Sequence, residues 1–385
     1  MQTQIIGVMK STQNGTGVLR DPARSFRSGP HDVHVPADIV SRYGLIEGAT
    51  VTGTVRQGKR RLELAEVATV CGMSPAAYQA RTPFAGLTVI DPHERFNLAL
   101  SAEKSMRIVD LIAPIGKGTR GLIVSPPKAG KTILLEHIAT AIRAAAPATR
   151  IIALLIDERP EEVTHFRRAV EVEVLASSSD QSVAEHVELA DLALAHVRTE
   201  LECGRDVVVL IDSITRLGRA SNSKGSGTGR TMSGGMEAGA LEMPRRFFGL
   251  ARNIEGGGSV TIIATALVDT GSRMDQLIFQ EFKGTGNCEI VLSRALSEQR
   301  IFPAINILES GTRKEALLYP PEEYEYLVSL RRLVAPNSPE DAIRLMLLLL
   351  DRYPDNATLL HNLPAPGRYR SVMPSEPAPH NPSHR

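Results

Sequence analysis

Five apolar runs, separated by stretches with helical spacing, dominate the chain from residue 121 onward. They are GLIV (121–124), IIALLID (151–157), DVVVLIDS (206–213), SVTIIATAL (259–267) and CEIVLS (288–293). Continuous apolar strands are typical of strands buried on both faces, and the helices between them cover a parallel sheet. The pattern therefore predicts an α/β core, which we assign to residues 106–360.

The first 70 residues have a different texture. Short β-rich runs are punctuated there by glycine and proline: IIGVM, TGVLR, DVHVP, TVTGTV and RLELAEV. This spacing favours a small OB-like (cold-shock-like) barrel over residues 1–70. Residues 71–105, which contain three prolines, are expected to be a linker. The tail at 361–385 is proline-rich, with six prolines from residue 364 onward, and we expect it to be disordered.

Composition excludes several classes of protein. The 44 Lys and Arg against 43 Asp and Glu give a net charge of +1, so any basic channel must be local. Three widely separated cysteines fit neither a disulfide framework nor a metal cluster. The N-terminus has no signal-peptide core, and the longest apolar stretch, LMLLLL, is too short to span a bilayer. We expect a soluble, cytoplasmic protein that does not enter a membrane.

A phosphate-binding loop is suggested by SPPKAGKT at 125–132, between the first apolar run and a helical pattern. Backbone N–H groups at a helix N-terminus attract an anion; Lys131 would contact the phosphates, and Thr132 would bind Mg²⁺. The usual motif has glycine where Ser125 stands, so a proline-stiffened turn remains the alternative. The candidates for contact with ATP are Lys128, Ala129, Gly130, Lys131, Thr132 and Ile133.

Two carboxylates end the next apolar runs. Glu158 is the candidate general base, because hydrolysis requires a group that orients water in line with the γ-phosphate. Asp212 would approach Mg²⁺ through water. Any buried strand that ends in Asp would give the same pattern. The phosphate loop, Glu158 and Asp212 follow successive predicted strands in this order, however, and together they favour a nucleotide site.

Arginines in the C-terminal half could stabilise charge on the transferred phosphate. Arg313 lies in SGTRKE, and Arg294 and Arg300 flank ALSEQ. A surface ion pair is the alternative for each. An arginine so far along the chain would more naturally reach a neighbour's site, which implies a ring of identical subunits.

Two loops favour a polyanionic partner. Residues 221–235 carry Lys224 and Arg230 among glycines and serines, and FKGTGN (282–287) carries Lys283, Gly284 and Thr285. Exposed N–H groups and cations of this kind contact nucleic-acid phosphates. The alternative is a pair of solvated mobile loops.

Taken together, these segments resemble the bacterial transcription terminator Rho family, whose members are hexameric RNA-dependent ATPases. The similar segments are PPKAGKT, LLIDERPEEVT, DSITRL, PRRFFGLARN, ATALVDTGS, EFKGTGN and SGTRKE. The resemblance covers residues 4–355 and implies a RecA-like P-loop ATPase core with ATP and Mg²⁺. It also implies single-stranded RNA and the RNA polymerase elongation complex as partners.

The resemblance further implies roles for individual residues. Lys131, Thr132 and Asp212 would hold Mg·ATP, assisted by Lys128. Glu158 would activate water, with Arg159 near the γ-phosphate. Arg313 resembles the arginine finger supplied by the neighbouring subunit, and Arg300 a second catalytic arginine. Lys224 and Arg230, together with Lys283, Gly284 and Thr285, match the loops that grip RNA.

The N-terminal part departs from the family. The resemblance implies a small helical subdomain before the barrel, whereas this sequence starts almost directly with the expected barrel. Thr16, Val18 and His34 stand where the family places aromatic platforms, and Phe26 and Tyr43 are the only aromatics in residues 1–70. Base stacking contributes about 1–3 kcal/mol per base, so the missing platforms should weaken RNA loading. Either the barrel contacts the RNA backbone without base selectivity, or it serves only as a scaffold.

Two other functions compete with an RNA-driven terminator. A rotary or secretion ATPase shares the strand order and the trans arginine, but KGTGN and the OB-like barrel argue against it. A non-catalytic RNA- or polymerase-binding module is disfavoured, because every identifiable catalytic position holds the expected residue type. The leading hypothesis is an ATP-driven RNA translocase that releases transcripts from RNA polymerase.

Overall fold

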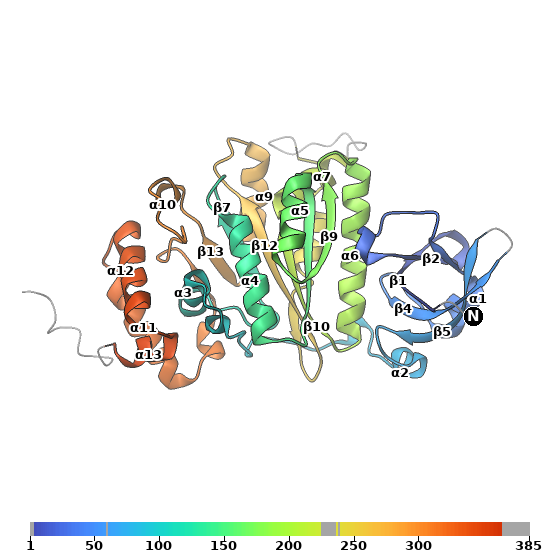
Figure 1. The fold of residues 1–385 in the computed structure, drawn as a ribbon, viewed down its shortest axis with the longest axis horizontal. Helices are drawn as coiled ribbons and strands as arrows, with labels where there is room; N and C mark the ends of the chain where they lie inside the picture. Colours follow the sequence, from blue (N-terminus) through green and yellow to red (C-terminus); the bar gives the residue numbers. More distant parts are fainter. Residues whose placement is uncertain (1–3, 59–60, 225–235, 238, 364–385) are drawn as a thin grey trace, which may run out of the picture.

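The computed structural model describes residues 4–58, 61–224, 236–237 and 239–363. A small barrel lies at one end, an α/β core in the middle, and a group of C-terminal helices at the other end (Figure 1). This arrangement confirms the predicted fold class.

The barrel is closed by five strands in the order β1-β2-β3-β5-β4. They are β1 (Gln4–Ser11), β2 (Gly17–Arg20), β3 (Val33–Val35), β4 (Thr50–Gln57) and β5 (Leu62–Val70). All five predicted runs are strands. Gly53 marks a register shift between β4 and β5, where a Cβ would lie 2.1 Å from the Glu66 carbonyl oxygen. A bulge of this kind bends a strand and helps a small barrel to close.

The central sheet has the strand order β14-β13-β7-β12-β10-β8-β9. Its strands are β7 (Arg120–Ser125), β8 (Arg150–Glu158), β9 (Glu173–Ser178), β10 (Asp206–Asp212), β12 (Ser259–Leu267), β13 (Cys288–Val291) and β14 (Gly311–Thr312). The strands pair in parallel except for β14, which runs antiparallel to β13. The carboxyl ends of the parallel strands therefore meet at one edge, where open α/β sheets bind ligands.

Helices cover both faces of the sheet (Figure 1). Ile151, Ala153 and Leu155 of β8 pack with α3 (Lys104–Ile112), α4 (Lys131–Ala145) and α5 (Pro160–Ala169). The alternate residues of β8 face a second core, which includes α6 (Val183–Glu202), α7 (Ile214–Lys224), α8 (Glu242–Phe248) and α9 (Arg273–Lys283). Burial of both faces explains the unbroken apolar runs.

The C-terminal helices pack against the first of these cores. They are α10 (Arg294–Glu298), α11 (Pro321–Val334), α12 (Pro339–Arg352) and α13 (Asn356–His361). Buried Arg107 of α3 donates to the carbonyl oxygens of Leu350 and Tyr353 and to Asn356 Oδ1 at 3.0–3.1 Å. One guanidinium thus satisfies carbonyl groups left open at the end of α12.

The barrel is attached to the core along α6. His196 Nδ1 lies 2.7 Å from the Gly48 carbonyl oxygen, and the Thr199 hydroxyl donates to the Glu47 carbonyl oxygen at 3.2 Å. Gly48 has a φ of +88°, and a Cβ there would lie 2.2 Å from the backbone of Ala195. Only glycine fits this close approach.

Some elements were not expected from the sequence. Residues 71–105 contain α2 (Pro75–Gln79) and β6 (Val89–Ile90), and β6 pairs with β11 (Arg252–Ile254) beside the central sheet. Strand β9 was also missed. In the part of the chain that the structure describes, no helix is long and apolar enough to cross a membrane.

Candidate active site

The loop between β7 and α4 forms a tight turn at the carboxyl edge of the sheet. Lys128 has a φ of +66° and Gly130 a φ of +93°, and Gly130 is the N-cap residue of α4. Pro126 and Pro127 have no N–H to offer, so the free backbone donors begin at Lys128. Ser125 is fully buried, and its hydroxyl turns back to the Pro126 carbonyl oxygen. The serine side chain is therefore accommodated at the position where the usual motif has glycine.

Three predicted residues converge on one ammonium group. Lys131 Nζ lies 2.6 and 2.8 Å from the two carboxylate oxygens of Asp212 and 3.5 Å from Glu158 Oε2. Thr132 Oγ1 lies 3.4 Å from Asp212 Oδ2. Asp212 ends β10 and Glu158 ends the neighbouring β8, so the strand order brings both acids to the loop.

Glu158 is held from the opposite side by a residue that the sequence did not single out. Arg216 Nη2 lies 3.1 Å from Glu158 Oε1, and the same guanidinium donates to the Asp157 carbonyl oxygen. Arg216 lies in the segment DSITRL, which resembles the family, but the sequence did not predict its contact with Glu158. Thr265, also missed, donates its hydroxyl to Asp212 Oδ1 at 2.8 Å.

The electrostatics of Glu158 differ from those of a surface carboxyl group. Burial raises its pKa above the ordinary value, and Asp212 acts in the same direction, whereas Lys131 and Arg216 oppose both. Arg159 donates its backbone N–H to Glu158 Oε1 at 3.1 Å, while its side chain is exposed. The carboxylate is thus fixed by charged donors but is desolvated, as a proton-accepting group in an active site often is.

An apolar cavity of about 380 Å³ adjoins the loop. Gly130 and Ile133 line one side, and Phe302 and Pro303 line another. Ile133 and Phe302 are 56% and 51% exposed, which is unusual for large apolar side chains. Ser297 Oγ donates to the Lys128 carbonyl oxygen at 3.0 Å and holds α10 beside the loop. Phe302 was not predicted to be a site residue, because a single aromatic residue in the sequence is more often part of a hydrophobic core than of a binding site.

Two of the candidate catalytic arginines, Arg300 and Arg313, lie at different ends of the sheet. Arg300 has a φ of +59° and follows α10, close to the phosphate loop, with its side chain exposed. The Arg313 N–H donates to the Asn287 carbonyl oxygen, and the Asn287 N–H donates to the Arg120 carbonyl oxygen at the start of β7. Ser125 lies five residues further along, about 16 Å at 3.3 Å per residue. Exposed Arg313 is therefore remote from the phosphate loop of its own chain.

The predicted basic loops follow two helices that pack together. Lys224 ends α7 and Lys283 ends α9, followed by exposed Gly284 and Thr285; Arg230 lies outside the described residues. Arg219 of α7 donates to buried Asp275 of α9, with Nε at 2.8 Å from Oδ1.

The close contact between α7 and α9 extends beyond this ion pair. A Cβ on Gly218 would lie 2.9 Å from the Ile278 side chain, so the backbone of α7 approaches α9 closely. Helix α7 follows Asp212 after one residue, and α9 follows the strand that carries Thr265. Both helices thus follow strands that contribute to the candidate site, α7 directly and α9 after a short loop.

The barrel presents no fully exposed aromatic ring in its described residues. Phe26 is 5% exposed and packs edge-on against His196, with ring centroids 6.0 Å apart. Tyr43 is partly buried. Thr16, Val18 and His34 are also partly buried. The aromatic residues of this barrel therefore serve packing.

Comparisons with known families agree with both halves of the chain. A family model described as "Rho termination factor, RNA-binding domain" matches residues 5–76. A second, "ATP synthase alpha/beta family, nucleotide-binding domain", matches residues 105–312.

Curated relatives extend over almost the whole chain. A protein of Cereibacter sphaeroides called "Transcription termination factor Rho" is 45% identical over 93% of this chain and 86% of its own length. A protein of the same name from Aquifex aeolicus is 46% identical over 92% of this chain and 83% of its own.

Solved structures with a similar fold are secretion-system or synthase-type ATPases. A prototypical ATPase of a bacterial type III secretion system aligns with a TM-score of 0.59 at 25% identity, over 76% of this chain and 81% of that one. An ATP synthase subunit of Nanoarchaeum equitans aligns with a TM-score of 0.55 at 20% identity, over 65% and 62%. These likenesses bear on the fold of the core. The identity and coverage of the curated relatives go further, and the chain belongs to the Rho family of transcription termination factors.

Proposed function

We propose that this chain forms a homo-hexameric ring that uses ATP to move along single-stranded RNA and to release transcripts from RNA polymerase. The chain is an RNA-dependent ATPase of the termination-factor family. The observation that carries the proposal is the cluster of Lys131, Asp212 and Glu158 at the ends of neighbouring strands, beside a glycine-capped helix N-terminus.

ATP would bind with its phosphates at the loop and its base in the apolar cavity. The N–H groups from Lys128 to Thr132, with the α4 dipole, suit the β- and γ-phosphates. Ile133 and Phe302 offer two exposed apolar faces to a planar base. Lys128, exposed on the loop, supplies a second cation for the phosphates.

Thr132 and Asp212 would hold Mg²⁺. Their oxygens are 3.4 Å apart, and a hydroxyl together with a carboxylate is a donor pair that this hard cation accepts. Bound Mg²⁺ would neutralise charge on the phosphate oxygens. When Mg·ATP binds, the Lys131 ammonium group would move from the carboxylates to the phosphates, because both kinds of anion attract it.

Glu158 would orient water and accept its proton. Its raised pKa makes the carboxylate a better proton acceptor than a surface carboxylate. Arg216 holds the carboxylate in place through Oε1. Arg159, one residue further along with an exposed side chain, would approach the γ-phosphate, and Arg300 would add positive charge from the α10 side.

Arg313 would act on the ATP of a neighbouring subunit. Its position about 16 Å of strand away from Ser125 supports a role in trans, because no rotamer of arginine spans that distance. A ring in which each subunit presents this edge to the next would complete all of the sites equally.

Hydrolysis would be coupled to RNA through α7 and α9. Both helices follow strands of the site, are clamped by Arg219 and Asp275, and end at Lys224 and Lys283. A shift at Asp212 would therefore be transmitted to both RNA-contacting ends together.

A rotary or secretion ATPase is the second candidate, favoured by the structural neighbours and by the synthase-type match of the core. The barrel match to an RNA-binding domain argues against it.

The test is the ATPase rate of the purified chain without RNA and with poly(C), poly(U) or mixed-sequence RNA. We expect stimulation by all three RNAs, since the barrel lacks exposed aromatic platforms. A marked preference for poly(C) would show that another surface selects cytidine. An unchanged rate with every RNA would overturn the proposal in favour of the secretion-type ATPase.

A further inference from the structure

A loop of the barrel enters the joint between the barrel and the core. It contains the 3₁₀ turn Pro22–Arg24, which is capped by Asp21. Ser25 and Phe26 both have positive φ, +51° and +59°, and both are 5% exposed. Two consecutive non-glycine residues in this region of φ are costly and are held only by firm packing. The loop is therefore rigid where it meets the core.

Ser25 is the anchor of this loop. Its hydroxyl oxygen accepts the Ala176 N–H of β9 at 2.9 Å, and Arg167 of α5 donates to it at 3.2 Å. The residues on either side of the anchored pair, Arg24 and Arg27, are exposed. The fold thus holds three guanidinium groups around one buried serine.

These arginines line a cavity of about 310 Å³ on the α5 side of the loop. At about 30 Å³ per water molecule, the cavity has room for about ten waters, more than a phosphate group needs. Pro160, Val163 and Arg167 contribute one face of α5, and Ser178 ends β9 beside them. No carboxylate lines the cavity among the described residues. None of the three arginines lies within ion-pair distance of a described carboxylate.

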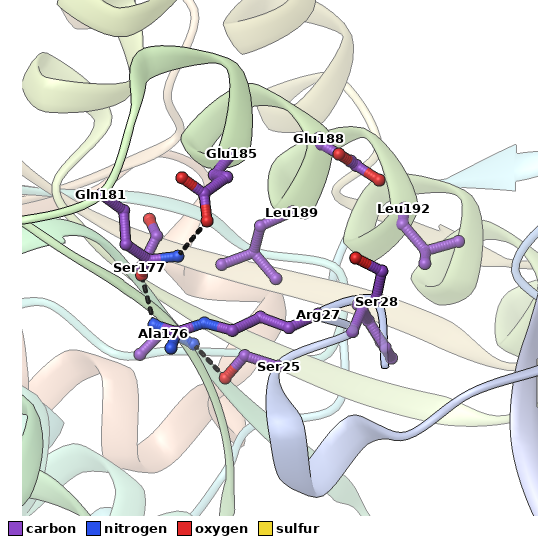
Figure 2. A pocket seen from close by; sticks show the side chains of 11 residues that line it. Ser25, Arg27, Ser28, Ala176, Ser177, Gln181, Glu185, Glu188, Leu189 and Leu192 are labelled. Carbon is purple, nitrogen blue, oxygen red and sulfur yellow. Dashed lines mark hydrogen bonds between the residues drawn. The ribbon is translucent and has the colours of Figure 1, made fainter. Parts of the chain in front are cut away.

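Asp21 of the loop caps the 3₁₀ turn, and on the α6 side Asp180 and Glu185 attract Arg27. Figure 2 shows that side, with Arg27 bonded to Gln181 and Gln181 bonded in turn to Glu185. Glu185 also accepts the Ser182 N–H and hydroxyl in a capping box. Glu188 pairs with Lys10. On the α5 side, Arg24 and Arg167 have no ion-pair partner among the described residues, whereas Arg27 is partly balanced by Asp180 and Glu185.

We propose that this arginine-lined cavity between barrel and core binds the phosphodiester backbone of single-stranded RNA, with Arg24, Arg27 and Arg167 as donors. Guanidinium groups recognise phosphate through paired N–H donors and read no base. RNA is the occupant that the position favours, because the loop belongs to the barrel that matches an RNA-binding domain. The inference rests on the RNA-dependent function proposed above and adds a contact that the family segments do not contain.

The cavity also lies behind the catalytic carboxylate. Ser178 and Pro160, which line it, flank the point where the Ser179 N–H donates to the Glu158 carbonyl oxygen at 2.9 Å. A phosphate held there contacts the same strand end that positions Glu158. RNA at this site would therefore reach the ATPase machinery without passing through the loops at Lys224 and Lys283.

The experiment measures binding of a labelled RNA of about ten nucleotides, a length that one OB-like fold covers, across a series of salt concentrations. The Arg24→Gln/Arg27→Gln variant should lose about 1.4 from the slope of log K against log salt, because each single-strand phosphate contact contributes about 0.7. Affinity at 0.1 M salt should fall roughly 10- to 25-fold, and equally for poly(C) and poly(U) fragments.

The matched control is Arg344→Gln/Arg352→Gln, which removes two exposed charges from α12 at the far end of the molecule from the barrel (Figure 1). This control should keep the wild-type slope. An unchanged slope in Arg24→Gln/Arg27→Gln, with RNA binding by the wild type intact, would overturn this inference alone. A loss confined to one base type would also overturn it. Absence of RNA binding by the wild type would instead overturn the proposed function.

Discussion

Lys131 Nζ lies 2.6 Å from Asp212 Oδ2, and the carboxylate that accepts this contact is 1% exposed. Glu158, whose side chain is 3% exposed, lies 3.5 Å from the same ammonium. One lysine thus contacts two buried acids, and removing it leaves Asp212 without its ion-pair partner and Glu158 with Arg216 alone.

We expect Lys131→Met to lower the free energy of unfolding by about 3–5 kcal/mol, the usual cost of breaking a buried pair. Urea unfolding without nucleotide would measure the change. Lys128→Met, which removes an exposed lysine from the same loop, should have little effect. Adding Asp212→Asn to Lys131→Met should restore most of the loss. Equal stabilities for Lys131→Met and Lys128→Met would contradict the argument.

Glu158→Gln should retain ATP binding and lose hydrolysis, with kcat lower by on the order of 10²–10⁴. The amide keeps the shape of the side chain but cannot accept the proton of water. Rapid-quench turnover and nucleotide binding would be measured side by side. Glu161→Gln, in the first turn of α5, is the control. Turnover near the wild-type rate in Glu158→Gln would mean that another group is the base.

Arg313→Ala and Lys131→Ala chains should each be inactive alone and partly active when mixed. In a mixed ring, some interfaces join an intact phosphate loop to an intact Arg313, since the two groups lie at opposite ends of the sheet. The ATPase rate would be followed against the mixing ratio, with native mass spectrometry to show that mixed rings form. If such rings form and remain inactive, Arg313 does not act in trans.

Phe302→Ala should raise the KM for ATP by roughly tenfold and change kcat little, because a stacked base contributes about 1–3 kcal/mol. Leu308→Ala, another partly exposed apolar change outside the cavity, serves as the control. Steady-state kinetics at saturating RNA would separate the two constants. A fall in kcat at unchanged KM would mean that the adenine base of ATP does not bind against Phe302.

The joint between barrel and core should weaken in mild acid. His196 is fully buried beside Arg150, Glu173 and Glu200, and burial lowers its pKa below the ordinary 6.5. The unfolded chain therefore takes up a proton more readily, so stability is complete above about pH 6.5 and falls as the pH drops below it. Nε2 has no partner among the described residues, and an added proton there would lack an acceptor.

Urea unfolding at about pH 7.5 and about pH 5.5 tests this. His196→Gln, whose amide can still donate to the Gly48 carbonyl oxygen, should lose part of the pH dependence that the wild type shows. Exposed His31→Gln should behave as the wild type. The same pH dependence in all three proteins would exclude His196 as the cause.

Much of the core could be predicted because strands that are buried on both faces appear in the sequence as unbroken apolar runs. The apolar runs at β7, β8, β10, β12 and β13 are all strands. Strand β9 escaped because it lies at the edge of the sheet, where Glu173, Ser177 and Ser178 interrupt the apolar pattern. An edge strand tolerates polar residues that a central strand would exclude.

Part of the candidate site could be predicted because Lys131 lies in a recognisable phosphate-loop motif and Asp212 ends an apolar run. Arg216 and Thr265 could not, since neither spacing nor composition reveals which arginine or threonine of a helix or strand meets a distant carboxylate. Phe26 shows the same limit for the barrel. The sequence offered it as an aromatic residue of the RNA-binding domain, whereas the structure buries it against His196.

Three of the contacts that fasten the barrel to the core end on the main chain of residues 47–71. His196, Thr199 and Arg205 bond to the carbonyl oxygens of Gly48, Glu47 and Cys71. Among the described residues, only a few barrel side chains, those of Lys10, Ser25, Arg27 and Thr50, complete the docking with polar contacts, so residues elsewhere on the barrel surface take no part in it. Over evolutionary time such a domain can exchange its outward-facing residues one by one and still sit in the same place. Thr16, Val18 and His34 can therefore stand in place of base-stacking rings while the joint to the ATPase core stays as it is.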